Sequence, residues 1–470
     1  MEAAGGAARN MRTFLIIWLG ELVSLMGSGM TSFALGVWIF QRTGEATPFA
    51  ITVMLGNLPR LLLLPVAGML ADRWNRRWLM ILADAGSALA TLAIVLLLSA
   101  GQLEVWHIYL LVVLSSVSST FQEPAYRASV TMLVPKKDLA RASGLMTAGE
   151  AVQLLVSPLL AGLLFVSIGM RGIILIDFVT FFFAVAALLV VRIPQPPLGQ
   201  AEARRKASLR RDMAFAWGYL RERTGLFWMV WYFALVNFLL NFAVVLNSPL
   251  VLSMANASTL GLVQMASGAG MLAGSVTIGA WGGPRRRIKG VVGFIALAGL
   301  GLMVMGLRPS PLLVGAGFLL LLFCIPIASG CNQALTQAKI EPSVQGRVFA
   351  VRGMISQSMM PLAFLIAGPL ADRVFGPALA VGGALAQTPL GTILGMGAGR
   401  GIGLMFVLSG LVLIAVSGVA WSYPRIRDVE DELPDVVTEE ASDAHTNGAV
   451  WAGGGEQRGG DAGTEAATGL

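Results

Sequence analysis

Charged residues are scarce in this chain. Asp, Glu, Lys and Arg make up 13% of its 470 residues, about half of the ~25% that is usual for soluble proteins. Hydrophobic residues make up 56%, and the mean hydropathy is +0.74. So few charges would not cover the surface of a water-soluble protein of this length. The composition therefore excludes a string of soluble domains, and the high hydrophobicity excludes intrinsic disorder over most of the chain.

Cysteine and histidine are rarer still, with two residues of each. Cys324 and Cys331 fall within one apolar run and are too few for a disulfide scaffold. His107 and His445 have no Cys or carboxylate cluster at metal-ligand spacing, so nothing supports a zinc centre or a Ser-His-Asp triad. The phosphate-binding motif G-x-x-x-x-G-K-[ST] is absent as well. We therefore expect neither an enzyme nor a resident cofactor or metal, and ATP is not the expected energy source.

Long apolar runs dominate the rest of the sequence. A helix needs ~20 mostly apolar residues to cross a bilayer, and helices are the way in which such runs satisfy their backbone groups in lipid. Twelve runs meet this requirement: 13–40, 48–70, 78–100, 106–124, 143–167, 171–192, 226–252, 258–281, 289–308, 311–337, 348–371 and 401–423. The sequence thus predicts an all-α polytopic protein with twelve transmembrane helices, embedded in the lipid bilayer of the cell (inner or plasma) membrane.

Basic residues gather on one side of these predicted spans. With the N-terminus inside, the outer segments carry five of the 33 Lys and Arg residues, namely Arg42, Arg171, Arg308, Arg373 and Arg400. Arg60 falls within a span, and all the others fall on the inner side. This asymmetry predicts that both termini are cytoplasmic. The pI of about 9.8 therefore follows from topology, and we expect no nucleic-acid partner.

The chain divides into five predicted parts. They are a cytoplasmic N-terminus (1–12), an N-terminal six-helix bundle (13–192), a cytoplasmic linker (193–225), a C-terminal six-helix bundle (226–423) and a disordered acidic cytoplasmic tail (424–470). In the linker, one helical face combines Leu209, Met213, Ala216, Trp217 and Leu220, which favours an amphipathic interfacial helix over a solvated linker. The tail holds 11 of the 26 acidic residues, and its composition is typical of disorder.

Two motifs carry a family resemblance. Gly68-Met-Leu-Ala-Asp72-Arg73-Trp-Asn75-Arg76-Arg77 is similar to the loop 2–3 signature of the major facilitator superfamily, G-x-L-A-D-R-x-G-R-R, with Asn75 at the second Gly. Ser157-Pro158-Leu-Leu-Ala161-Gly162 resembles the antiporter motif G-P-x-x-G-G of exporters. A further stretch, Gly368 to Arg373, repeats the first letters of the signature but lies at the outer end of its span.

With the stretches Trp18 to Ser28 and Ile176-Asp177-Phe178, the chain over about residues 13–423 resembles the macrolide-efflux and siderophore-exporter branch of the drug:proton antiporters. The resemblance implies two six-helix bundles around a central cavity, alternating access, a small-molecule substrate and a proton gradient as the energy source. We expect a monomer. Two alternatives stay open: a nutrient or metabolite importer or uniporter of the same fold, and a non-transporting membrane sensor or immunity protein.

Ionisable residues inside the spans are candidates for function, because a charge at the bilayer centre costs at least ~2.5 kcal/mol. Glu21 begins a polar face of the first span that continues with Ser24 and Ser28. Such a face is expected to line a cavity. Burial disfavours the ionised form of a carboxyl, so Glu21 is a candidate to take a proton from outside and release it inside. A structural hydrogen bond is the alternative.

The other intramembrane charges are assigned as follows. Glu150 forms a second polar face with Gln153 and Ser157 and is a second proton-coupling candidate, with helix packing as the alternative. Arg60 is expected to neutralise Glu21 or Glu150, or to bind an anionic group of the substrate. The alternative is a fixed ion pair or snorkelling to the surface, and we favour a pair. Asp177 is a third coupling candidate, with a local pair to Arg171 as the alternative.

The resemblance implies that loop 2–3 latches the outward-facing state through charge contacts with neighbouring helices. The predicted inner-side gate comprises Gly68, Asp72, Arg73, Arg76, Arg77 and, one and a half turns into the next span, Asp84. Predicted substrate-cavity residues are uncharged hydrogen-bonding side chains, which suit a large amphipathic ligand but also serve as interhelical contacts. They are Ser24, Ser28, Gln153, Asn237, Asn241, Asn332, Gln333 and Thr336.

Overall fold

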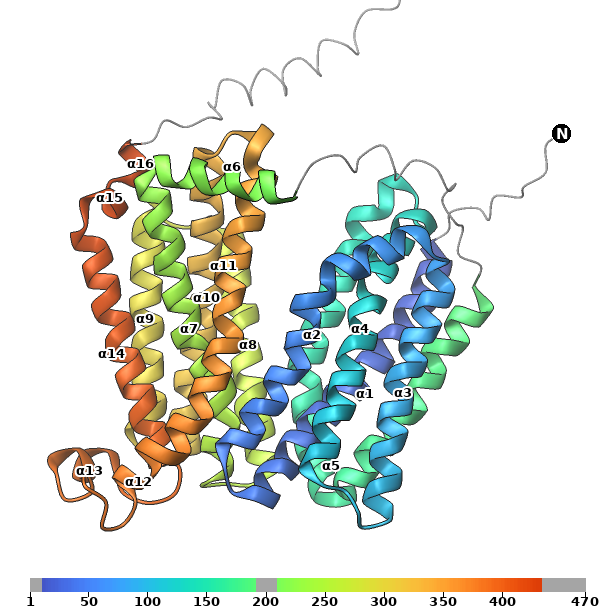
Figure 1. The fold of residues 1–470 in the computed structure, drawn as a ribbon, viewed down its shortest axis with the longest axis horizontal. Helices are drawn as coiled ribbons and strands as arrows, with labels where there is room; N and C mark the ends of the chain where they lie inside the picture. The colour runs from blue at the N-terminus through green and yellow to red at the C-terminus, as the bar shows by residue number, and fades with distance from the viewer. Residues whose placement is uncertain (1–10, 192–208, 433–470) are drawn as a thin grey trace, which may run out of the picture.

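The computed structural model describes residues 11–191 and 209–432, which form two helical bundles standing side by side (Figure 1). The N-terminal bundle contains α1 (Met11–Thr43), α2 (Ala46–Arg73), α3 (Arg76–Ser99), α4 (Val105–Leu133), the 3-10 turn η1 (Lys136–Asp138) and α5 (Leu139–Val190). The C-terminal bundle contains α7 (Thr224–Leu252), α8 (Ala257–Trp281), α9 (Arg287–Leu307), α10 (Pro311–Lys339), α11 (Pro342–Leu370) and α14 (Arg400–Ser422). Shorter elements are α6 (Leu209–Glu222), the π-helical turn η2 (Ala371–Phe375), α12 (Gly376–Leu379), α13 (Pro389–Leu394), α15 (Pro424–Arg427) and α16 (Val429–Glu432).

Helix α5 contains two of the predicted spans, and the chain reverses between them. At Gly169 the backbone leaves the helical region with φ 66° and ψ −178°, a conformation that glycine adopts without steric strain. Before this point α5 runs parallel to α1, since Gly149 lies beside Trp18 and Ser157 beside Gly29. After Gly169, α5 runs antiparallel to α1. Gly20 of α1 lies beside Ala187, whereas Gly27, further along α1, lies beside Asp177.

Within the described residues, eleven helices are long and apolar enough to cross a membrane. Because α5 supplies two spans, the predicted all-α fold with twelve transmembrane helices is confirmed. The predicted ends differ at α4, which was expected to stop at residue 124. The helix instead continues through Pro124 to Leu133, and Arg127 therefore lies on a helix and not in an inner loop.

The two bundles touch at one end of the molecule. A Cβ on Gly261 of α8 would lie 2.5 Å from the carbonyl oxygen of Pro158 in α5, and Ser258 donates a 3.0 Å hydrogen bond to the Gly162 carbonyl. Helices α6 and α16 lie at the other end of the molecule, which we call the terminal end (Figure 1). We call the end at which the bundles touch the opposite end. At the terminal end the ribbons of the two bundles diverge.

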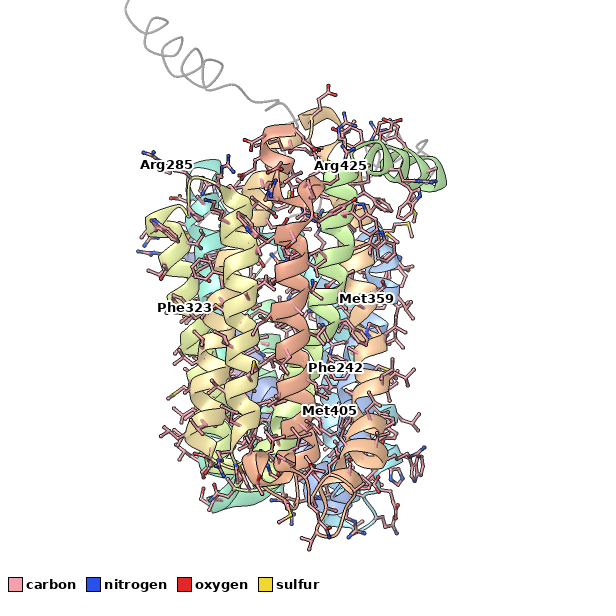
Figure 2. All side chains as sticks on the ribbon, turned by 90° about the vertical axis from the view of Figure 1, so that its left-hand side faces the viewer. Phe242, Arg285, Phe323, Met359, Met405 and Arg425 are labelled. Carbon is pink, nitrogen blue, oxygen red and sulfur yellow. The ribbon has the colours of Figure 1, made fainter. Side chains whose placement is uncertain are left out.

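The terminal end of the C-terminal bundle is covered by α6 and by the last described residues. The predicted amphipathic helix is present as α6, which buries Ala216 and Leu220. The Arg347 guanidinium lies 4.7 Å from the ring centre of Phe215 on this helix. Arg285 and Arg425 also lie at this end of the molecule, as Figure 2 shows.

The predicted start of a disordered tail at residue 424 is wrong, since the folded chain continues to Glu432. Val429 is fully buried, and the Glu430 carboxylate accepts hydrogen bonds from the backbone N–H groups of Arg287 (2.5 Å) and Ile288 (3.3 Å). These groups begin α9, so Glu430 caps that helix from outside it. The acidic composition of this segment indicated solvation and did not predict the contact between Glu430 and α9. The rest of the predicted tail, 433–470, lies outside the described residues.

Replacing Glu430 with Ala is expected to lower the stability of the folded protein by about 1 kcal/mol, the usual contribution of a helix cap. Glu430→Gln should cost less, because its amide oxygen still accepts from α9. Burial raises the pKa of Glu430 despite these N–H donors and Lys339, so a neutral acceptor suits the site. Thermal unfolding in detergent measures both changes. Glu432→Ala is the control: its pair with Arg425 is exposed and should contribute little. Equal effects of Glu430→Ala and Glu432→Ala would contradict the assignment.

Candidate functional site

A polar cavity of ≈ 290 Å³ lies inside the N-terminal bundle, between α1, α3, α4 and the second half of α5. Three carboxyl side chains line it, those of Glu21, Asp84 and Asp177. Ser24 and Ser28, two predicted cavity residues, line it as well. Among the described residues that form its wall, none is Lys, Arg or His. This first cavity therefore concentrates acidic side chains without a basic counterpart.

Glu21 and Asp84 are held together by the amide of Gln122. Its nitrogen donates to Glu21 Oε2 at 2.9 Å and to Asp84 Oδ1 at 2.6 Å. The second oxygens of the two carboxyls, Glu21 Oε1 and Asp84 Oδ2, are buried and have no hydrogen-bond partner among the described residues. We refer to Glu21 and Asp84 as the paired carboxyls. The prediction that Asp84 joins the loop 2–3 gate is wrong, because its side chain points into the bundle and bonds to α4.

Asp177 lies further along the same cavity, toward the opposite end. It is 6% exposed and accepts a 3.2 Å hydrogen bond from Ser28 of α1. Arg171, the alternative partner expected from the sequence, is exposed. The local ion pair is therefore a wrong expectation, because Asp177 faces α1 across the bundle. Its place as a proton-coupling candidate stays a prediction.

A second cavity, of ≈ 450 Å³, adjoins the first and shares Glu21 and Gln122 with it. Its wall has apolar surface from Trp18, Leu25, Tyr126 and Met146. It also includes Gln153, one of the predicted cavity residues. The amide of Gln153 donates a 3.1 Å bond to the Leu25 carbonyl on α1. Among the described residues, Glu21 is thus the one carboxyl that lines both the acidic first cavity and the larger second one.

Four alternating charges line one side of the second cavity, and we call them the charge ladder. Arg60 bonds to Glu123 at 2.6 Å, Glu123 to Arg127 at 3.1 Å, and Arg127 to Glu150 at 3.1 Å. The predicted partners of Arg60, Glu21 or Glu150, are therefore wrong. Glu123 lies within the predicted span 106–124, and α4 presents it to Arg60, whereas Arg127 lies on the continuation of that helix. The i,i+4 spacing of Glu123 and Arg127 is the sequence signal that was available and missed.

The polar residues predicted in the C-terminal bundle lie apart from both cavities. Asn237 donates to the Phe233 carbonyl at 2.8 Å, and Asn241 to the Asn237 carbonyl at 2.7 Å, so each bonds within α7. Thr336 donates to the Asn332 carbonyl at 2.6 Å, whereas Gln333 is exposed. Contact of any of these side chains with substrate stays a prediction.

The loop 2–3 motif ties three helices of the N-terminal bundle together. Buried Arg76 donates to the Ala128 carbonyl of α4 at 2.8 Å, and Arg77 donates to the Leu188 and Leu189 carbonyls of α5, both at 2.7 Å. Asn75, which stands where the family signature has Gly, caps α3 by accepting from the Arg77 and Trp78 N–H groups. Gly68 faces open space, and the side chains of Asp72 and Arg73 lie outside the described part.

The antiporter-like motif lies where the bundles touch at the opposite end. Ser157 donates a 3.2 Å bond to the Met26 carbonyl of α1. A Cβ on Gly162 would lie 2.7 Å from the Ala257 carbonyl oxygen and 3.1 Å from Cα of Gly261. The small residues of the motif therefore permit backbone contact between α5 and α8.

Two bundles of six membrane-spanning segments, with cavities that hold buried carboxyls, define a membrane transporter and not an enzyme. The family model of the Major Facilitator Superfamily matches residues 17–364. The chain therefore belongs to the major facilitator superfamily, and the resemblance seen in its motifs is confirmed. Among the residues that the structure describes, no group of three or more His, Cys, Asp or Glu side chains is placed to hold a metal ion.

Relatives of this chain include efflux proteins. It is 29% identical to Macrolide efflux protein A of Streptococcus pyogenes over 363 residues, which cover 74% of this chain and 87% of the relative. The protein of that name from Enterococcus faecalis is 29% identical over 323 residues, 66% of this chain and 96% of the relative. The multidrug efflux pump Tap of Mycolicibacterium fortuitum is 29% identical over 119 residues, 25% of this chain and 29% of the relative.

Solved transporter structures share the fold. A bacterial homologue of the human lysosomal transporter Spinster, in an inward-facing and unoccupied conformation, superposes with a TM-score of 0.67 at 15% identity, covering 92% of this chain and 100% of that one. The nucleoside transporter NupG gives a TM-score of 0.62 at 12% identity, covering 88% and 100%. At these identities the likeness concerns the fold alone.

Gly261→Leu is expected to abolish transport while leaving the protein folded in the membrane. The larger side chain would meet the Pro158 backbone, which has no flexible end to move aside, so the bundles could not close at the opposite end. A loss of at least about tenfold in transport rate would correspond to about 1.4 kcal/mol. Gly279→Leu on the same helix is the matched control, because a Cβ there meets nothing within 4 Å. Equal transport by both variants would contradict the role given to this contact.

Proposed function

We propose that this protein is a secondary active transporter that exports hydrophobic or amphipathic small molecules, of the drug or macrolide-like kind, in exchange for protons. The observation that carries the proposal is the joining of Glu21 and Asp84 through Gln122, at the place where the two cavities meet. The names of the related efflux proteins support export as the direction.

The paired carboxyls suit proton binding. Two ionised carboxylates close together in a low-dielectric site repel each other, so the pair favours holding one proton. Each carboxyl keeps a buried oxygen that has no hydrogen-bond partner among the described side chains, and a bound proton would lower the resulting desolvation cost. Asp177, further along the first cavity, supplies the next carboxyl for a proton that arrives from the opposite end.

The second cavity suits the substrate. Its size falls within the usual range of small-molecule sites, ~300–1,000 Å³, and its wall combines Trp18, Tyr126 and Met146 with polar groups. Aromatic side chains commonly line small-molecule pockets, and methionine adapts to ligands of varied shape. Glu21 contacts both cavities, so the arrival of substrate on one side and the binding of a proton on the other compete at a shared residue. Such competition is what exchange transport requires.

The predicted topology places the terminal end in the cytoplasm. With that orientation the bundles are closed on the outside and apart on the inside, which is the state that would receive a substrate for export. Binding and release then alternate as the bundles rock about the central cavity. We propose that one chain is sufficient, since all three carboxyls and both cavities belong to a single N-terminal bundle.

Glu21→Gln is expected to abolish proton-driven export, because the amide cannot take up and release a proton. The measurement is accumulation of ethidium and erythromycin in efflux-deficient cells, with and without a protonophore. The unmodified protein should lower accumulation, and the protonophore should remove that effect. Glu341→Gln is the matched control, because that exposed carboxylate makes no side-chain cap bond and lies outside both cavities. Full protonophore-sensitive export by Glu21→Gln would exclude Glu21 as the coupling residue.

Inverted membrane vesicles with an acidified interior distinguish export from import. Substrate added outside such vesicles meets the cytoplasmic face, so exchange should release protons from the interior and restore the fluorescence of a trapped pH indicator. The expected response is present in the unmodified protein and absent in Glu21→Gln. An importer that carries protons together with its substrate would give no such release, and that result would contradict the proposed direction.

A further inference from the structure

A carboxylate of the C-terminal bundle caps a helix of the N-terminal bundle. Asp372 lies in η2, directly after α11, at the opposite end. Its Oδ1 accepts from the Ala46 N–H at 2.9 Å, and its Oδ2 accepts from the Thr47 N–H at 2.7 Å and the Thr47 hydroxyl at 2.5 Å. Three donors at the start of α2 therefore converge on one side chain that belongs to the other bundle.

Helix α2 has no cap of its own. Glu45 occupies the N-cap position but makes no side-chain cap bond, so the first N–H groups of the helix need another partner. A negative charge at a helix N-terminus is also favoured by the helix dipole. Asp372 meets both needs, but only while the two bundles are in contact at this end.

The residues around Asp372 allow the close approach of α2 that this contact requires. One turn earlier, a Cβ on Gly368 would lie 2.6 Å from Cα of Thr47, so any larger residue would push α2 away. The chain then widens into the π-helical turn η2, which is an uncommon conformation often found at functional positions. The stretch Gly368 to Arg373 is the one that repeats the letters of the loop 2–3 signature, and neither cavity uses it.

We propose that Asp372 is a latch that holds the opposite end closed, and that its three bonds must break each time this end opens. The inference rests on the alternating access of the proposed function. Rocking of the bundles separates the start of α2 from η2, which leaves both the carboxylate and the first turn of α2 to water. The α5–α8 contact closes the same end through glycines, whereas the latch closes it through a charged side chain whose bonds are reversible.

The test is a distance measurement across the opposite end. Spin labels are attached at Gln102→Cys, in the exposed turn after α3, and at Val381→Cys, which is 85% exposed, in a chain whose Cys324 and Cys331 are replaced by Ala. In nanodiscs, the full chain should show mainly the short distance. Asp372→Ala should raise the ratio of long to short distances about fivefold or more, the factor that corresponds to loss of a helix cap.

Two further variants separate latching from misfolding. Thr47→Val removes one of the three donors and leaves Asp372 in place, so its shift should be smaller and in the same direction. Arg373→Ala changes the exposed neighbour of Asp372 and should leave the distances unchanged. Unaltered distances in folded Asp372→Ala and Thr47→Val would overturn the proposal, and so would an equal shift in Arg373→Ala.

A cross-link tests whether the contact must open during transport. Oxidation of Thr47→Cys/Asp372→Cys should join the bundles, and transport should fall at least about tenfold and return on reduction. Undiminished transport by the cross-linked protein would overturn the latch. The distance measurement needs no substrate. Its result would therefore stand even if the proposed substrate class or proton coupling were wrong, so failure of the latch proposal can be distinguished from failure of the proposed function.

Discussion

A polar group inside a bilayer must find its partner within the protein, because the hydrocarbon region contains no water to supply one. This constraint accounts for most of the structure. The backbone is satisfied by helices, and α7 satisfies Asn237 and Asn241 on its own carbonyls. Two helices without a side-chain cap of their own receive one from another element, as Glu430 caps α9 and Asp372 caps α2. The paired carboxyls are among the exceptions, since each retains a buried oxygen with no partner among the described residues.

The same constraint explains why Glu21 and Asp84 differ from the charge ladder. Arg60, Glu123, Arg127 and Glu150 alternate in sign, and their side chains are between 33% and 58% exposed, so the ladder is neutral overall and partly hydrated. Exposed pairs of this kind contribute little to stability. The first cavity, which both paired carboxyls line, has no Lys, Arg or His among the described residues of its wall, and a proton is the smallest cation that can compensate the pair.

Much of the fold could be predicted from simple sequence patterns. Apolar runs of sufficient length indicate the spans, and the loop 2–3 letters indicate the family. The departures have physical causes. Helix α4 continues through Pro124 to Leu133, and this extension carries Arg127, which pairs with Glu123 and Glu150 beside the second cavity. The cap formed by Glu430 on α9 was not predicted, because the sequence does not distinguish a carboxylate bonded to a helix N-terminus from a solvated one.

The candidate site was predictable only in part. Glu21 could be identified because a charge within a span is costly, and the structure places it at the junction of the two cavities. The pairing of Glu21 with Asp84 could not be predicted, since no sequence pattern indicates that Gln122 of α4 donates to both carboxyls. Asp177 was expected near Arg171 because the two are close in sequence, whereas the turn at Gly169 directs Asp177 toward α1. Side-chain direction across a bundle is a property of packing, and spacing along one helix does not determine it.

A gate must be stable enough to close and weak enough to open, and a borrowed helix cap meets both conditions. A cap contributes about 0.5–2 kcal/mol, which shifts the balance of two states without fixing it. A fully buried ion pair between the bundles would be less suitable, since separating it leaves a charge whose desolvation costs about 3–5 kcal/mol. At the opposite end, both Asp372 and the first turn of α2 pass into water when the contact breaks, and water replaces each lost bond. The contact between the bundles is therefore reversible because the groups that form it are satisfied in either state.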